Sequence, residues 1–130
     1  MREHASSIKP VVALSPAVRA ASAMGGSIDR LGFEKLSFLV TTGDWTNGSH
    51  AVVAEESADN ANWTAVPAAS LTKALPTVDA AGKGNASTLV GYLGDARYVR
   101  VKANVSGSPA TGAVVGVVVL LAGARAKPVQ

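Results

Sequence analysis

The stretch Tyr98-Val99-Arg100-Val101-Lys102-Ala103-Asn104-Val105 alternates polar and apolar side chains without interruption. This period of two is typical of a β-strand with one face in water and one face buried. After the turn-forming residues 106–112, the run from Ala113 to Ala122 contains only apolar residues and glycine. We interpret the two runs as neighbouring strands, and together they place the chain in the all-β class.

Length and composition agree with a single β domain. A chain of 130 residues fits one core, and a domain of this size buries roughly two-thirds of the surface that its unfolded chain exposes. Charged residues make up only 16%, against roughly 25% in ordinary soluble domains. This shortage indicates either assembly with other subunits or simply a β protein rich in small residues.

Charge is distributed unevenly along the chain. Residues 97–130 hold five basic residues and no acid, whereas residues 36–96 hold six acids and only two lysines. The basic end is therefore predicted to meet an acidic surface, either on a neighbouring copy or on another partner. Binding to nucleic acid would call for basic residues interleaved with aromatics, and only Tyr98 provides such a pairing. We expect no nucleic-acid partner.

The absence of cysteine excludes disulfides and thiolate metal sites. The first residues, Met1 to Ser7, lack the apolar core of a secretory signal. The run from Ala113 to Ala122 is far shorter than the ~20 residues of a membrane-spanning helix. We therefore expect a protein made in a cytoplasm, with no membrane partner and no cofactor.

Three segments are predicted. Residues 1–27 contain Pro10 and Pro16, which push their predecessors into extended conformations, and this segment is predicted to be an extended N-terminal arm. Residues 28–123 form a β-sandwich domain, and residues 124–130 form a C-terminal tail.

Within the domain, turn signals separate short alternating runs. Asn47-Gly48 favours a hairpin that joins residues 28–42 to residues 51–56. Gly94-Asp95 is predicted to close a second hairpin, between residues 87–93 and 97–105. Residues 63–66 form a further strand, and proline, alanine and glycine in residues 68–84 indicate a surface loop.

This spacing gives six or seven strands in roughly 95 residues, which favours an antiparallel two-sheet sandwich. The strand count does not distinguish a jelly-roll from an immunoglobulin-like topology.

Catalytic patterns are lacking, so no enzymatic activity is predicted. Glu55 and Glu56 are adjacent on a strand and point to opposite faces, so they cannot flank one bond as acid and base. His50 has no second histidine or cysteine at metal-ligand spacing. A hydrolase would require His50 to meet a serine and an acid in space. Gly82-Lys83-Gly84 lacks the full spacing of a phosphate-binding loop.

Two tryptophans support a different hypothesis. Trp45 and Trp63, together with Tyr92 or Tyr98, would form a stacking surface for sugars if they were exposed. A carbohydrate-binding β-sandwich module is therefore the alternative function. The competing interpretation of both tryptophans is that they belong to the core.

Four motifs carry a resemblance to a known group. They are Ile28-Asp29-Arg30 with Gly32-Phe33-Glu34, Val53-Ala54-Glu55-Glu56-Ser57-Ala58-Asp59, Trp63-Thr64-Ala65-Val66-Pro67, and Arg97-Tyr98-Val99-Arg100-Val101. In these motifs, which fall within residues 26–122, the chain resembles small proteins encoded beside major capsid genes in tailed bacteriophages. Some members of that group resemble capsid cement or decoration proteins.

The resemblance implies a structural virion protein on the capsid exterior, made in the cytoplasm of a bacterial host. Its expected partners are the major capsid protein and further copies of itself, as a dimer or a trimer. Such a protein stabilises the shell by bridging capsid subunits. With the same resemblance, the carbohydrate-binding alternative would be a module of a phage tail or fibre. The segment predicted to contact the capsid or a neighbouring copy consists of Lys9, Pro10, Val11, Val12, Ala13 and Leu14.

Overall fold

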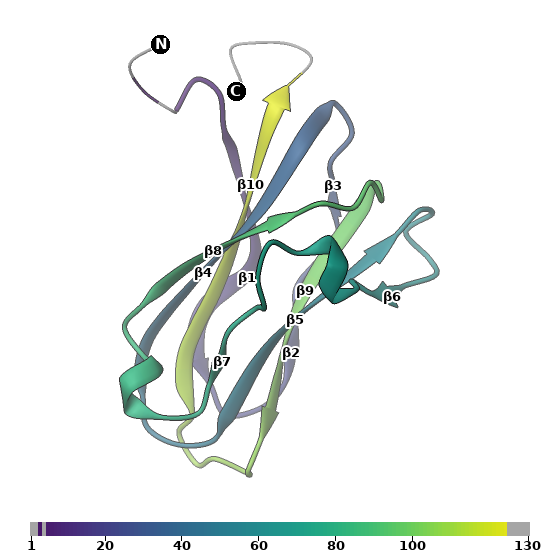
Figure 1. Cartoon of the computed structure of the whole chain (residues 1–130). Coiled ribbons are helices and arrows are strands. Elements are labelled where there is room, and N and C mark those ends of the chain that lie inside the picture. The colour runs from purple at the N-terminus through teal and green to yellow at the C-terminus, as the bar shows by residue number, and fades with distance from the viewer. Residues whose placement is uncertain (1–2, 4, 125–130) are drawn as a thin grey trace.

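The structure, a computed structural model, describes Glu3 and residues 5–124. The described chain forms two antiparallel sheets that pack face to face (Figure 1). The four-stranded sheet has the order β1-β10-β4-β8, and the second sheet has the order β2-β9-β5-β6, with β3 also paired to β9 and β7 to β5. The strands are β1 (Lys9–Arg19), β2 (Ala23–Met24), β3 (Ile28–Asp29), β4 (Phe33–Trp45), β5 (Ser49–Ser57), β6 (Thr64–Ala65), β7 (Thr77–Val78), β8 (Ser87–Tyr92), β9 (Tyr98–Ser106) and β10 (Ala113–Ala124).

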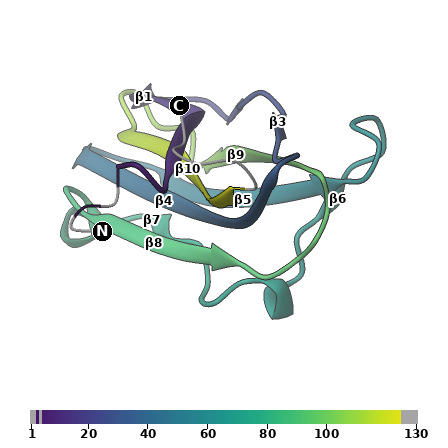
Figure 2. The same cartoon turned by 90° about the horizontal axis from the view of Figure 1, so that it is seen from above.

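The predicted all-β, antiparallel two-sheet sandwich is confirmed, and strand pairing identifies its topology. β1 pairs with β10, β2 and β3 pair with β9, β4 pairs with β8, and β5 pairs with β6 and β7. These are the pairings of one long antiparallel ribbon that folds back after β5 and passes repeatedly from one sheet to the other. Figure 2 shows the same strands from above. This wrapped ribbon is the jelly-roll arrangement, in which β2 and β3 together take one position of the second sheet and β6 and β7 take another.

Alternate residues of the long strands fill the space between the sheets. Phe38 and Val40 of β4 and Val117 and Val119 of β10 meet Val101 of β9 in this core, and each is at most 1% exposed. The inward positions therefore follow the period-two pattern from which the strands were predicted.

Three of the predicted strand pairings are wrong. β9 and β10 lie in opposite sheets, and so do β4 and β5, and β8 and β9. The turns at Asn47-Gly48 and Gly94-Asp95 reverse the chain as predicted, but the next strand crosses to the other sheet. Turn residues fix only a local change of direction. Which sheet receives the next strand is decided by how the inner faces of the two sheets pack on their common core.

The predicted boundary between an arm and the domain also differs from the structure. Residues 9–19 are extended as predicted, but they form β1, an edge strand that pairs with β10 from Lys9↔Leu121 to Arg19↔Ala113. Proline is tolerated at a sheet edge because its missing N–H faces away from the partner strand. The sandwich therefore begins at Lys9. Of the predicted tail 124–130, Ala124 ends β10 and the other residues lie outside the described residues.

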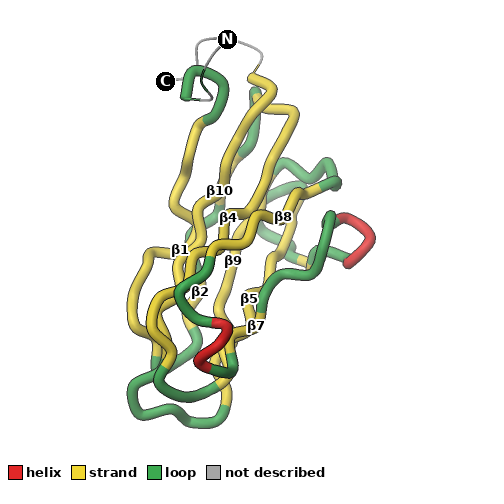
Figure 3. Tube along the Cα trace, turned by 60° about the vertical axis from the view of Figure 1, so that its left-hand side comes forward, coloured by secondary structure: helices red, strands yellow, loops and turns green. Residues whose placement is uncertain are grey.

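The predicted surface loop, residues 68–84, contains β7 and two short 3₁₀ turns, η1 (Ala68–Ser70) and η2 (Ala81–Lys83) (Figure 3). It is anchored at Val78, which is 1% exposed, and at Leu71, which bridges to Tyr92. No helix in the described part of the chain is long and apolar enough to span a membrane.

Candidate functional site

The outer surface of the four-stranded sheet carries an unbroken row of apolar side chains. Strand register places Val12 of β1 beside Val118 of β10, Val118 beside Leu39 of β4, and Leu39 beside Leu89 of β8. Val12 is 58% exposed and Leu89 is 52% exposed. In the next row, Pro10 lies beside Leu120. We call the surface formed by Pro10, Val12, Ser37, Leu39, Leu89, Val118 and Leu120 the apolar face.

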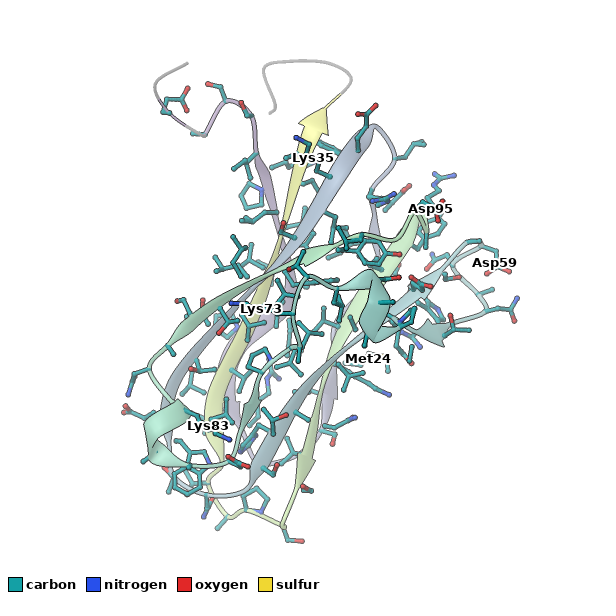
Figure 4. All side chains as sticks on the ribbon, viewed as in Figure 1. Met24, Lys35, Asp59, Lys73, Lys83 and Asp95 are labelled. Carbon is teal, nitrogen blue, oxygen red and sulfur yellow. The ribbon has the colours of Figure 1, made fainter. Side chains whose placement is uncertain are left out.

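Charge is absent from the middle of this face. The charged residues of its four strands lie within two residues of a strand end, and they are Lys9, Arg19, Glu34, Lys35 and Asp44. Figure 4 shows Lys35 near one end of the molecule and Lys83 of η2 near the other. An exposed apolar surface without charge in its middle is characteristic of a surface that binds another protein.

An apolar hollow of about 320 Å³ lies at one end of the apolar face. Ala5, Ile8, Pro10 and Leu120 line it, so it belongs to the edge formed by β1 and β10. Among the residues that the structure describes, none that lines this hollow is charged.

The outer surface of the second sheet has the opposite character. Nε of Arg100 on β9 lies 2.8 Å from Oε1 of Glu55 on β5, and Nζ of Lys102 lies 3.8 Å from its Oε2. The Arg100 guanidinium also lies 4.2 Å from the centre of the Trp63 ring. We call this surface, formed by Glu55, Trp63, Arg100 and Lys102, the charged face.

Contacts between the basic segment 97–130 and the acidic segment 36–96 form within the chain, since Arg100 and Lys102 both lie against Glu55. In addition, Nε and Nη2 of Arg97 donate to the carboxylate of Asp29, which lies outside the acidic segment, at 2.9 and 2.8 Å. These hydrogen bonds hold the pKa of Asp29 below its usual range. Arg100 lies on β9 and pairs with Glu55 of β5, and Arg97, which directly precedes β9, pairs with Asp29 of β3.

A polar hollow of about 510 Å³ borders the end of the charged face, between the β5–β6 turn and the β8–β9 turn. Glu56, Asn62, Thr64, Asp95 and Arg97 are among its lining residues. Figure 4 shows Asp59 and Asp95 in these two turns, on the same side of the molecule.

Two of the carboxylates in this region are held by internal hydrogen bonds. Burial and a 2.6 Å hydrogen bond donated to Glu56 raise the pKa of Tyr92 to about 12. The backbone N–H groups of Asn62 and Ala61 donate to Asp59 and hold the pKa of its carboxyl far below the usual range. These contacts shape the turn and the strand end around the hollow.

The two tryptophans proposed for sugar stacking are not brought together. Trp45 precedes the turn that enters β5, whereas Trp63 precedes β6, which pairs with the other end of β5. A nine-residue strand separates them by roughly 27 Å. The Trp45 indole N–H donates to the Gly48 carbonyl at 2.9 Å, and Arg100 covers one face of Trp63.

His50 is a core residue. Its side chain is 0% exposed, and its Nε2 lies 3.0 Å from the carbonyl oxygen of Asn47. Its Nδ1 has no hydrogen-bond partner among the described residues. An imidazole in this position is out of reach of a substrate, so the geometry does not assemble the serine, histidine and acid that a hydrolase would need.

The remaining candidates have structural contacts. Glu55 and Glu56 point apart, since Glu55 pairs with Arg100 and Glu56 accepts from Tyr92. Lys83 in the predicted loop tip pairs with Asp79 at 2.8 Å. No group of three or more histidine, cysteine, aspartate or glutamate side chains within the described residues is arranged to hold a metal ion.

The six residues predicted to contact the capsid or a neighbour separate into two groups. Ala13 and Leu14 are 2% and 3% exposed and pack in the chain's own core. Lys9, Pro10 and Val12 are exposed, and Val11 is half-buried. Pro10 and Val12 belong to the apolar face, which sequence analysis missed because the face depends on register between four strands. The available signal was the lack of polar residues on either face of residues 113–122.

Comparison with known proteins supports the fold. The chain is similar in structure to the PBSX exported protein XepA, with a TM-score of 0.54 and 21% sequence identity. The similarity covers 94% of this chain but only 39% of the XepA chain. No protein-family model matches the chain, and no curated protein sequence is significantly similar to it. The likeness establishes a shared sandwich architecture with a part of a phage-related protein.

Proposed function

We propose that this chain is a structural phage protein that binds the outer surface of a capsid and stabilises it by bridging capsid subunits. The observation that carries the proposal is the presence of two unlike faces on one small sandwich. The apolar face is uncharged, whereas the charged face holds Glu55, Arg100 and Lys102. A bridging subunit needs at least two binding surfaces, because it must hold a capsid subunit and a second neighbour at once, and that neighbour is either another copy or another capsid subunit.

Two further observations support the proposal. The architecture resembles that of XepA, a protein of the phage PBSX, and the sequence motifs resemble those of small proteins encoded beside major capsid genes. In addition, the polar groups that a reaction would use are engaged internally, as with His50, Glu56 and Asp59. We therefore assign the chain a role in binding, without substrate turnover.

The physical basis is linkage between binding and shell stability. A subunit that binds the assembled shell, and not its separated parts, stabilises the shell by its binding free energy at each site. When two capsid subunits are held by one rigid body, whether a single sandwich or a pair of copies, the second contact becomes intramolecular and gains an effective-concentration advantage. Many copies on one particle therefore oppose the outward pressure of packaged DNA.

The test is co-sedimentation of the purified chain with particles assembled from the major capsid protein encoded beside it. We expect saturable binding at a fixed number of copies per particle, and a higher temperature for DNA release from decorated particles than from bare ones. An unrelated soluble β-sandwich of similar net charge serves as the control for nonspecific adsorption. Absence of binding at saturating concentration would contradict the proposal.

A further inference from the structure

We propose that the apolar face binds a second copy of this chain, so that two sandwiches pack with their four-stranded sheets face to face. The inference rests on the proposed function only in supposing that copies meet at high concentration. Its evidence is the arrangement of Val12, Val118, Leu39 and Leu89 across the sheet.

The size of the face suits a second copy. Four strands about 4.8 Å apart, with outward positions along some 26 Å of β10, give a flat footprint of roughly 500 Å². The largest apolar patch on a typical monomer covers about 300–600 Å², and a standard protein interface buries about 800 Å² on each partner. Because side chains project from the flat footprint and a rim surrounds it, the face approaches the area of a standard interface.

The row of four side chains is complementary to itself. A two-fold axis parallel to the strands, between β10 and β4, would place β1 of one copy against β8 of the other. Val12 then faces Leu89 of the second copy, and Val118 faces Leu39 of the second copy. Packed sheets keep their strands within about 30° of each other, which this axis satisfies.

The edges of the face are complementary as well. Lys9, Leu121, Leu36 and Tyr92 lie at one level of the sheet, because each pairs with the next. At the next level Ala122 of β10 pairs with Lys35 of β4. Ile8 precedes β1 and Leu93 follows β8, on the two outer edges of the sheet. Leu93 is 67% exposed, and Ile8 lines the apolar hollow of about 320 Å³. The same axis brings Leu93 of the second copy to this hollow.

Charge also favours a second copy as the occupant. The charged residues of these strands lie at the strand ends, so two copies meet here without burying an unpaired charge in the middle of the interface. A partner with a charged surface would find no side chain of opposite charge in the central rows of the apolar face. The charged face remains outside the pair and is left free for the shell.

The experiment measures the oligomeric state of the full chain by sedimentation equilibrium. We expect a dimer of the wild-type chain, and at least a tenfold higher dissociation constant for Val12→Lys and for Leu89→Lys. Met24→Lys is the matched control, since Met24 is 51% exposed and lies on the second sheet beside Lys102. Leu93→Lys tests the hollow, with Leu31→Lys as its control, because Leu31 is 62% exposed in a loop.

A monomeric wild-type chain, or a dimer that Met24→Lys weakens as much as Leu89→Lys does, would overturn the inference. A monomer in which Leu89→Lys abolishes particle binding would also overturn it, since the shell would then occupy the face. Failure of the proposed function has a different signature, namely a dimer sensitive to Leu89→Lys that does not bind particles. Circular dichroism of each variant establishes that the substitution leaves the fold intact.

Discussion

The ring of Pro16 lies directly over Gly116, and its Cβ is 2.8 Å from the position that a Cβ on Gly116 would occupy. Pro16 belongs to β1 and Gly116 to β10, so the contact joins the first strand of the sandwich to the last. The missing side chain at Gly116 is what allows the edge strand to approach here.

Gly116→Ala is expected to lower the free energy of unfolding by about 1–3 kcal/mol, because the proline ring and its backbone cannot yield as a flexible side chain would. Gly82→Ala is the control, since nothing lies within 4 Å of its Cβ position. Urea denaturation of both variants measures the difference. Equal stability of the two variants would show that β1 does not pack on β10 in this way.

Leu14→Ala tests whether β1 is an integral strand. Leu14 is 3% exposed in the core, so its truncation is expected to cost about 2–5 kcal/mol. Val18→Ala on the same strand is the control, because Val18 is 59% exposed and its truncation should change stability by no more than about 0.5 kcal/mol. If residues 9–19 were a detached arm, thermal melting would not distinguish the two variants.

Burial of Tyr92 and its hydrogen bond to Glu56 predict that the folded chain loses stability at alkaline pH. The pKa of Tyr92 is raised to about 12 from an ordinary value of 10.0, so the folded state holds this proton more tightly than the unfolded state. The resulting stabilisation is complete below pH 10 and is lost as pH rises through about 12. Spectrophotometric titration of tyrosinate should show this late step in the wild-type chain.

Tyr92→Phe should remove the late step and lower the free energy of unfolding at neutral pH by about 1–3 kcal/mol, because Glu56 loses its donor. Tyr98→Phe is the control that keeps the Tyr92–Glu56 contact. Persistence of the late step in the Tyr92→Phe variant would assign it to another group.

Trp63 provides the test of sugar binding. Because Arg100 lies 4.2 Å from the ring centre and Trp45 is at the far end of β5, panels of mono- and oligosaccharides are expected to leave tryptophan fluorescence unchanged. Arg100→Ala, which uncovers the ring, should change the emission by itself and shows that the probe responds. A saturable change on adding a sugar to the wild-type chain would restore the carbohydrate-binding alternative.

Sequence analysis predicted strands well and their partners poorly, for a physical reason. Alternation at residues 98–105 reports that one face of the strand is buried, and Val99 and Val101 are indeed 0% exposed. That signal is the same whichever sheet the strand joins. The turn at Asn47-Gly48 likewise fixes a reversal, with Gly48 at φ +85°, yet β4 and β5 enter different sheets.

The candidate faces were still harder to predict, because each is built from residues far apart in sequence. Val12, Leu39, Leu89 and Val118 become neighbours only through the pairings of four strands. The pair Arg100–Glu55 depends in the same way on the register between β9 and β5. The segment 9–14 was predicted to be extended and to make contacts, and its extended conformation is confirmed. Its position as an edge strand could not be predicted, because it depends on pairing with β10.

The pairing of Lys9 with Leu121 has a consequence for biosynthesis. The opening strand of the four-stranded sheet has no partner in that sheet until β10 has left the ribosome, so the sandwich closes only after residues 113–124 have been synthesised. Folds dominated by such distant pairings assemble on the slow side, in milliseconds to seconds. A nascent chain interrupted before β10 would therefore expose both the β1 edge and the β4 edge, where it is most prone to aggregate.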